Sequence, residues 1–359
     1  MKVLFVAGDV KRIGGIEKYN KDFVYALSQA GATISLVQRR EGGFMAKASF
    51  LCRFLFTFVQ HRPDIIFCGH LNFSPVCIIL KSIWGTPYTL ALYGIEVIKV
   101  NGLLKRQGVL GAQLIITISE YTKDLILRQF PEKKDQIFML PSAVDGSIFH
   151  IKEKSQSLIE KFNIAGRPVI LSLARLATSE HKGQDRVLRS FPRVLKRIPD
   201  AVYLIVGSGH DDRVNTLLHE SSVLDGSVIV AGPISDSERV DYYNLADVFV
   251  LPSKFEGFGI VFIESLACGV PVVASDGYGC REGLLNGEIG LLVNPDDTKM
   301  IADTIVEVLE KRASERFCDR EYLRRRTLEV YGMAAWNERV KMLLDLLCQS
   351  EPVKARMAA

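Results

Sequence analysis

Two glutamates lie in a stretch of the chain that is otherwise almost wholly apolar. The stretch EGFGIVFIESLACGVPVVAS runs from Glu256 to Ser275, and its second acid, Glu264, follows the first by eight positions. A carboxylate that is buried without a partner is costly, so each of the two must meet a donor, a cation or a ligand. The glycine-rich start of the stretch precedes a predicted helix over 260–268, whose positive end favours an anion.

Two cations precede this stretch. The segment LARLATSEHKGQD follows a predicted strand and carries Arg175 and Lys182. Taken alone, such residues are more often solvated surface charges. Because both follow a strand end in the same half of the chain as the glycine-rich helix start, the combination favours a binding site for a diphosphate.

Two further glycine loops follow strands. In AGDVKRIGGIEKY, Gly14 and Gly15 precede a predicted helix, where a phosphate or sugar could approach backbone N–H groups; a plain tight turn is an equal alternative. In VGSGHDD, Gly207 and Ser208 resemble part of a dinucleotide fingerprint. The third glycine of that fingerprint is missing, which disfavours a dehydrogenase. We retain these four residues as candidates for donor binding.

Short apolar runs alternate with helix-length stretches along the whole chain. Ten runs are predicted strands: KVLFVA, TISLVQ, DIIFCG, YTLALY, LIITIS, PVILSLA, VYLIVG, SVIVAG, DVFVLP and VPVVAS. The alternation predicts an α/β fold of two Rossmann-like, doubly wound parallel-sheet domains, with a boundary at 163/164 inside the polar stretch 150–168. Ligands of such sheets bind at the carboxyl ends of the strands, so we expect the site in the cleft between the domains.

Composition excludes several classes of protein. A chain of 359 residues with 48% hydrophobic and 24% charged residues suits two globular domains. No apolar run reaches the roughly 18 residues of a membrane-spanning helix. The start, MKVLFVAGDV, is predicted to be a strand rather than a signal peptide. Seven cysteines without a CxxC pair indicate reduced thiols in a cytoplasm, and neither a disulfide framework nor a zinc site.

The net charge of +4 is unevenly distributed. Residues 1–163 carry 21 Lys and Arg against 13 Asp and Glu, whereas residues 164–359 carry 24 against 28. A basic first half suggests an anionic partner, such as a membrane surface or a phosphorylated acceptor, with ordinary surface charge as the alternative. A nucleic acid is disfavoured because basic and aromatic residues do not interleave in one cluster.

These residues together resemble the large family of retaining GT-B glycosyltransferases that use nucleotide-sugars, which includes bacterial mannosyl-, glucosyl- and N-acetylglucosaminyltransferases. The E-x7-E motif of the family matches Glu256 and Glu264, and its upstream Arg/Lys pair matches Arg175 and Lys182. The resemblance implies that Glu264 accepts hydrogen bonds from the donor ribose, that Glu256 lies beside the transferred sugar, and that the two cations hold the diphosphate.

The resemblance extends over about residues 2–310. GGIE at 14–17 matches the glycine loop of the family, LPSAVDGSIF resembles its interdomain segment, and GYGCREGLLNGEIGLLV resembles its late acidic segment. The backbone N–H groups of Phe258, Gly259 and Ile260 are then expected to help hold the phosphates. No metal and no cofactor are implied, apart from the nucleotide-sugar as donor substrate.

The family often carries a histidine after the fourth strand, where this chain has Tyr93 in LYGIE. Tyr93 and Glu96 are expected near the acceptor and the transferred sugar. The final helix, near 336–347, resembles one that crosses back onto the first domain. The implied organisation is an acceptor-binding domain over 1–163, a nucleotide-sugar-binding domain over 164–332 and a crossing helix over 333–359.

The implied activity is retaining transfer of a hexose from a GDP- or UDP-linked sugar to a lipid-linked or polysaccharide acceptor in cell-surface glycan biosynthesis. The alternatives are a nucleotide-sugar epimerase or a starch- or sucrose-type transferase on the same fold, and a catalytically silent nucleotide-sugar-binding scaffold. Turnover of nucleotide-sugars would separate these classes. We expect a cytoplasmic protein.

A predicted helix over 44–62, FMAKASFLCRFLFTFVQHR, holds more apolar residues than one buried stripe needs. A helix wholly committed to the core is one interpretation. With the basic first half, the pattern also predicts peripheral contact with an anionic membrane, at the inner face of the plasma membrane.

Overall fold

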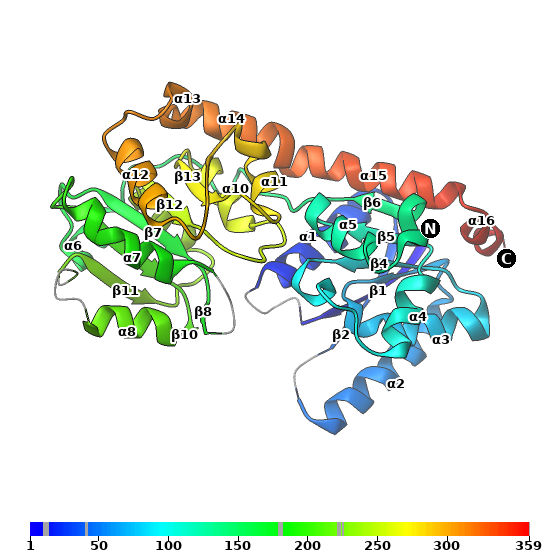
Figure 1. Cartoon of the computed structure of the whole chain (residues 1–359). Helices are drawn as coiled ribbons and strands as arrows, with labels where there is room; N and C mark the ends of the chain where they lie inside the picture. Colours follow the sequence, from blue (N-terminus) through cyan, green and yellow to red (C-terminus); the bar gives the residue numbers. More distant parts are fainter. Residues whose placement is uncertain (10–13, 40–41, 179–181, 221–223, 225, 359) are drawn as a thin grey trace. The chain divides into compact units, whose positions relative to one another are not determined.

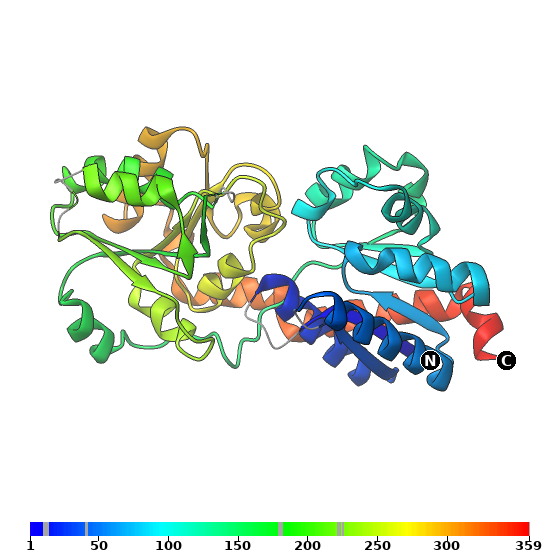
Figure 2. The same cartoon turned by 90° about the horizontal axis from the view of Figure 1, so that it is seen from below.

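The computed structural model describes residues 1–9, 14–39, 42–178, 182–220, 224 and 226–358. The chain forms two compact units. Unit 1 comprises Met1–Ala143 and Ala334–Ala359, and unit 2 comprises Val144–Met333. Figures 1 and 2 trace both units from two directions.

The described part of unit 1 contains a parallel sheet with strand order β2-β1-β3-β4-β5-β6. The strands are β1 (Lys2–Gly8), β2 (Thr33–Arg39), β3 (Ile65–Cys68), β4 (Tyr88–Leu92), β5 (Leu114–Thr117) and β6 (Ile137–Met139). The helices are α1 (Gly15–Gln29), α2 (Phe44–His61), α3 (Ser74–Trp84), α4 (Leu103–Gly111), α5 (Glu120–Leu127), α15 (Met333–Gln349) and α16 (Glu351–Met357). The 3₁₀ turns are η1 (Leu71–Phe73), η2 (Ile95–Val97) and η3 (Pro131–Gln136).

The described part of unit 2 contains a second parallel sheet, with strand order β11-β9-β7-β12-β13-β14. Its strands are β7 (Val169–Leu173), β9 (Val202–Val206), β11 (Val228–Gly232), β12 (Val248–Leu251), β13 (Val272–Ser275) and β14 (Leu291–Val293), and β8 (Leu176–Ala177) pairs separately with β10 (Gly209–His210). The helices are α6 (Gln156–Phe162), α7 (Gln184–Leu195), α8 (Asp212–Glu220), α9 (Arg239–Leu245), α10 (Ile260–Ala267), α11 (Cys280–Gly283), α12 (Thr298–Leu309), α13 (Glu315–Cys318) and α14 (Arg320–Tyr331), and the 3₁₀ turn η5 spans Leu285–Gly287.

The α/β prediction with two parallel sheets is confirmed, and all ten predicted runs contain strands. The central strands β3, β4, β9 and β12 are buried at every position, as parallel strands covered by helices on both faces must be. The helix predicted over 44–62 is α2, which buries only Phe50, Phe54 and Phe58. No helix in the described ranges is long and apolar enough to cross a membrane.

The units divide at 143/144, earlier in the chain than the predicted boundary at 163/164. The reason is local: residues 144–163 are tied to the second sheet and its helices. Arg324 donates to the carbonyl oxygens of Phe149, at 2.6 Å, and Gly146, at 2.8 Å, while the N–H of Lys152 donates to Asn244. A polar composition therefore did not mark a linker here.

The chain returns to unit 1 at its carboxyl end. In Figure 1, α15 follows α14 and ends near α16. The indole Nε1 of Trp336 donates to the carbonyl of Pro141 at 2.6 Å, and its ring packs edge-on against Tyr19 and Phe23. Because Trp336 is fully buried, α15 is part of the core of unit 1.

Candidate functional site

The predicted residues of unit 2 gather at one edge of its sheet. Strands β9, β7 and β12 are parallel neighbours, so the loops that follow them leave from the same edge. Gly207 and Ser208 follow β9, Arg175 follows β7, and Glu256 follows β12. These are the carboxyl ends of the strands, the edge at which parallel α/β sheets bind their ligands.

Glu256 forms an ion pair with Lys182. The ammonium Nζ donates to Oε2 at 3.0 Å, and the two side chains are only 20% and 16% exposed. The carbonyl oxygen of Lys182 accepts from Ser253 Oγ at 2.8 Å, which fastens this loop to the end of β12. The first predicted acid and one predicted cation thus form a pair at the strand ends, while residues 179–181 of the same loop lie outside the described residues.

The other predicted cation, Arg175, is exposed and lies in the turn between β7 and β8. That turn is held against the loop after β9, because the N–H of Leu176 donates to the carbonyl of Ser208 at 2.8 Å. Gly207 has φ +150°, and a Cβ there would lie 2.0 Å from the carbonyl oxygen of Ala174. Close backbone approach therefore accounts for Gly207 in this structure.

The start of α10 has the features expected of an anion site. Gly259, the N-cap residue, has φ +91° and no side chain that could cap the helix. By helix geometry the N–H groups of Ile260 and Val261 have no partner within the helix, whereas the N–H of Phe262 donates to the carbonyl of Gly259 at 3.0 Å. Phe258 is buried, with its ring edge-on to Tyr331 at 5.3 Å, so packing fixes the backbone just before the helix.

Glu264 is fully buried, and its partners were missed by sequence analysis. Oε2 accepts from the guanidinium of Arg239 and from the Tyr243 hydroxyl, at 2.8 Å for the latter. Both donors lie on α9, in the segment SERVDYYNLAD. A cation and a tyrosine four residues apart share one helix face, but nothing in that spacing names Glu264 as their target.

The carboxylate of Glu264 stabilises the charged form of Arg239 and the protonated form of Tyr243. Burial opposes the charge of Arg239, but the Glu264 carboxylate raises the pKa of the guanidinium above its usual range. Burial also raises the pKa of the Tyr243 hydroxyl, and the charge of Glu264 raises it further. Tyr243 therefore remains a protonated donor at neutral pH.

The glycine loop in unit 1 lies at the start of α1. Gly14 is the N-cap residue, and the helix begins at Gly15. A Cβ on Gly14 would lie 2.2 Å from a carboxylate oxygen of Glu17, so this acid of the first turn folds back over the loop. Residues 10–13 of the loop lie outside the described residues.

Tyr93 is buried in unit 1. Its hydroxyl lies 2.8 Å from Asn20 Oδ1 and 3.1 Å from the carbonyl oxygen of Gly69, and its N–H donates to the Glu96 carboxylate. Burial raises the pKa of both Tyr93 and Glu96. The Tyr93 hydroxyl is thus engaged with groups inside the unit, and the expected place of Tyr93 and Glu96 near the acceptor and the transferred sugar stays a prediction.

His70 was not among the predicted site residues. Its ring stacks on Tyr93, with ring centroids 6.4 Å apart. Its Nδ1 accepts from the N–H of Asn72 at 3.0 Å, and burial, helped by the charge of Lys105, lowers its pKa to about 4. A neutral imidazole therefore lies directly after β3.

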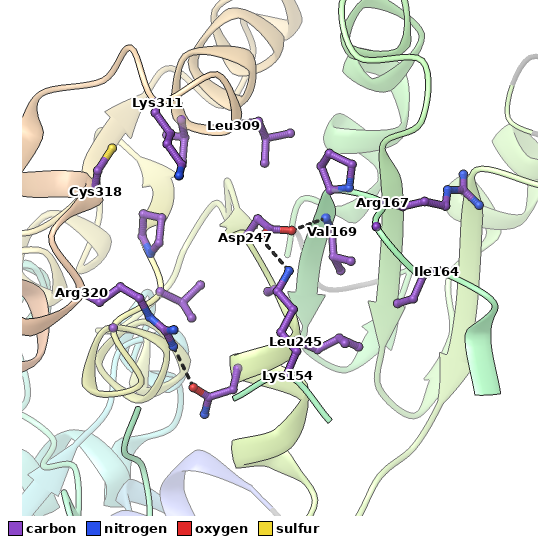
Figure 3. Close-up of a pocket in the computed structure, with 18 of the residues that line it drawn as sticks. Lys154, Ile164, Arg167, Val169, Leu245, Asp247, Leu309, Lys311, Cys318 and Arg320 are labelled. Carbon is purple, nitrogen blue, oxygen red and sulfur yellow. Dashed lines mark hydrogen bonds and ion pairs between the residues drawn. The ribbon is translucent and has the colours of Figure 1, made fainter. Parts of the chain in front are cut away.

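A cavity of about 490 Å³ lies at the other edge of the second sheet. Figure 3 shows it beside Val169, at the amino end of β7. Lys154 donates to Asp247 at 2.7 Å, and Asp247 also accepts from the N–H of Val169, so the polar groups there tie the chain to the sheet. None of the predicted site residues lines this cavity. Among the described residues, no three His, Cys, Asp or Glu side chains are grouped as a metal site.

Comparison with known proteins finds a family match in the second half of the chain. Residues 154–325 match the family described as glycosyl transferases group 1. The chain is 30% identical, over 56% of its length and 54% of the relative, to the GDP-mannose-dependent alpha-(1-6)-phosphatidylinositol monomannoside mannosyltransferase of Mycobacterium tuberculosis. It is 24% identical to the capsular polysaccharide biosynthesis glycosyltransferase CapM of Staphylococcus aureus, over 98% of this chain and 92% of that protein. The chain spans about half the length of the mycobacterial relatives it matches.

Solved structures agree on the fold. Sucrose-phosphate synthase from Thermosynechococcus elongatus superposes with a TM-score of 0.81 at 21% identity, over 97% of this chain and 99% of that chain. HepE of Anabaena, solved in complex with UDP and glucose, gives a TM-score of 0.77 at 19% identity, over 96% and 100%. The chain therefore has the GT-B fold of these structures, and residues 154–325 match the group 1 glycosyl transferase family.

Proposed function

We propose that the protein transfers a hexose from a nucleotide-sugar to an acceptor, with retention of the anomeric configuration. The observation that carries the proposal is the Lys182–Glu256 pair at the strand ends of the group 1 segment, beside a helix start without a side-chain cap. A relative that uses GDP-mannose supports a nucleotide-linked hexose as donor.

In this proposal the diphosphate of the donor binds Arg175, Lys182 and the first N–H groups of α10. The acceptor oxygen attacks the anomeric carbon from the face of the leaving group, and the bond from that carbon to the diphosphate breaks. The acceptor proton passes to a diphosphate oxygen, so no separate base is needed. The cations stabilise the leaving charge, which preorganised donors do well in a site of low dielectric constant.

Glu256 lies beside the transferred sugar in this scheme. When a diphosphate binds Lys182, the ion pair between Lys182 and Glu256 is weakened. The Glu256 carboxylate can then accept hydrogen bonds from sugar hydroxyls. Glu264 accepts from the donor ribose. The protein groups supply binding, orientation and charge stabilisation, and we propose that no metal is needed.

We propose a lipid-linked or polysaccharide acceptor. The names of relatives include a phosphatidylinositol monomannoside mannosyltransferase and a capsular polysaccharide glycosyltransferase. The excess of Lys and Arg in residues 1–163 is consistent with an anionic acceptor or membrane.

Unit 1 also exposes apolar side chains on α2 and α3 that support membrane contact, and we call this set of side chains the α2–α3 face. It consists of the exposed side chains Phe44, Met45, Leu51, Leu55, Phe56, Val59, Ile79, Ile83 and Trp84. Phe44 is 82% and Phe56 68% exposed, and Trp84 contacts Phe58 of α2 with ring centroids 5.5 Å apart. Exposed Lys47 and Arg53 lie on the same helix, a combination suited to anionic lipid.

Thermal unfolding in the presence of candidate donors tests the proposal. GDP-mannose, UDP-glucose, UDP-N-acetylglucosamine, GDP and UDP would each be added at about 100 times the expected Kd, where binding to the folded state adds about 2.7 kcal/mol. For a unit of this size that corresponds to a rise in Tm of about 5–10 °C. We expect one base to stabilise the protein. No shift with any of them would contradict a nucleotide-sugar enzyme.

A further inference from the structure

The two oxygens of Glu264 have different surroundings. Oε2 accepts from Arg239 and from Tyr243 Oη, whereas Oε1 is buried and has no partner among the described residues. Buried acceptors are nearly always satisfied, so an orphaned carboxylate oxygen in a fully buried side chain calls for an explanation. Both donors come from α9, so both are directed to one side of the carboxylate.

Arg239 is held in place from several directions. Its side chain is 15% exposed, its guanidinium lies over the Phe149 ring at 5.8 Å from the centroid, and Nη1 is 3.7 Å from Asp236. A structural Arg–carboxylate pair commonly uses both carboxylate oxygens in a bidentate fork. Here the guanidinium of Arg239 donates to Oε2 of Glu264 and not to Oε1. The Nε of Arg239 is also buried without a partner among the described residues. The arrangement fixes one oxygen and leaves the other available.

We propose that Arg239 is a positioning residue, which orients the Glu264 carboxylate so that Oε1 is left to accept from a ribose hydroxyl of the donor. The inference rests on the proposed function and adds to it a residue outside the E-x7-E motif. Tyr243 shares the task as a second donor to Oε2. Since Oε1 is shielded from solvent, binding must shift the side chains that cover it.

The proposal predicts a coupling between Arg239 and the ribose hydroxyls. In the wild-type protein, GDP or UDP should bind more tightly than its 2′,3′-dideoxy counterpart by about tenfold to a hundredfold, the worth of a hydrogen bond to a charged group. In Arg239→Met, Glu264 loses the cation that orients it. The ribonucleotide should then bind almost as weakly as the dideoxynucleotide, so that the ratio of the two Kd values falls to about 1–3.

Calorimetry with the four nucleotides would measure these ratios on the whole chain. Arg326→Met is the matched control, because Arg326 pairs with Glu288 at 2.6 Å on the surface of the same unit; its ratio should equal that of the wild type. A general loss of stability would weaken the binding of the ribonucleotide and of the dideoxynucleotide equally, and would leave the ratio of their Kd values unchanged. Arg239→Lys keeps the cation without the planar fork and should give an intermediate ratio.

The outcomes are distinct. If the wild type binds neither GDP nor UDP, the proposed function fails and this inference with it. If the wild type binds one of them but with a ratio near 1, Glu264 does not accept from the ribose; the inference and the ribose role of Glu264 are overturned, while nucleotide binding by the protein still stands. If Arg239→Met keeps the wild-type ratio, Arg239 has no positioning role. Should Arg239→Met not fold, Arg239→Lys and Tyr243→Phe decide: an unchanged ratio in both overturns the proposal.

Discussion

Glu264 and Arg239 form an ion pair whose carboxylate is fully buried, and this changes what a substitution of Glu264 should do. From the sequence alone, Glu264→Gln is expected to weaken donor binding and to leave the fold intact. In the structure, glutamine would leave the largely buried Arg239 charge with only the exposed Asp236, 3.7 Å away, as a counter-ion. We therefore expect a loss of about 3 kcal/mol in the free energy of unfolding, in addition to weaker donor binding.

Urea unfolding of unit 2 would measure this loss. Glu288→Gln is the control, since Glu288 and Arg326 are both about one-third exposed and such pairs contribute only about 0–1 kcal/mol. Equal stability of the two variants would show that Arg239 does not depend on Glu264.

Lys182 and Arg175 should matter for turnover rather than for stability. Removing either cation leaves part of the leaving diphosphate charge unstabilised, so Lys182→Ala and Arg175→Ala should each lower kcat on the order of 10²–10³-fold. Lys154→Ala, which removes a cation paired with Asp247 at the opposite edge of the sheet, should leave kcat near the wild-type value. Near-normal turnover in both site variants would mean that the diphosphate binds elsewhere.

His70 predicts a dependence of stability on pH. Its pKa is about 4 in the folded protein and near 6.5 in an unfolded chain, so the unfolded state takes up the proton first as the pH falls. The free energy of unfolding should therefore decrease between about pH 6.5 and pH 4, by on the order of 3 kcal/mol, and His70 should contribute no slope above pH 7. His70→Gln should remove this part of the slope, whereas replacement of the exposed His210 should not. A slope that persists in His70→Gln would assign it to other groups.

At the scale of elements, strands and long helices could be predicted well from the sequence. Runs such as VYLIVG and DVFVLP are almost wholly apolar and bounded by polar residues or glycine, so each gives a clear signal. The edge strands β6 and β14 have only three residues each, IFM and LLV, and were missed because so short a run has no period.

The candidate site was predictable to a lesser degree. Residues placed by strand ends, such as Glu256 and Lys182, could be predicted because parallel strands deliver their loops to one edge. The partnership of Arg239 with Glu264 could not, because it depends on how α9 packs against α10. The burial of Tyr93 could not be predicted either, since its partners Asn20 and Gly69 come from distant parts of the chain.

The α2–α3 face should bind anionic membranes in a salt-sensitive way. Each basic residue near such a surface contributes about 1 kcal/mol, and screening weakens it. We expect the protein to float with vesicles of anionic lipid at low salt and to be released at high salt. Replacing Phe44 and Phe56 by serine should reduce binding, while Tyr25→Ser, on the exposed surface of α1, should not. Absence of the protein from vesicles at low salt would favour a soluble acceptor.

At the scale of the whole molecule, two parallel sheets with the GT-B fold and a group 1 segment support the central proposal that the chain breaks the bond between a sugar and a nucleoside diphosphate. The identity of the base and the sugar depends on contacts that neither the motif nor the fold specifies.

Hydrolysis of a donor in the absence of acceptor tests the central claim most directly. The whole chain would be incubated in excess EDTA with GDP-mannose, UDP-glucose or UDP-N-acetylglucosamine, and the anomeric proton of the released sugar followed by NMR. We predict that one donor is consumed slowly, that the sugar first appears in the configuration it has in the donor, and that Lys182→Ala is slower on the order of 10²-fold or more. Consumption of no donor above the level of Lys182→Ala, or activity that requires added magnesium or manganese, would contradict the account.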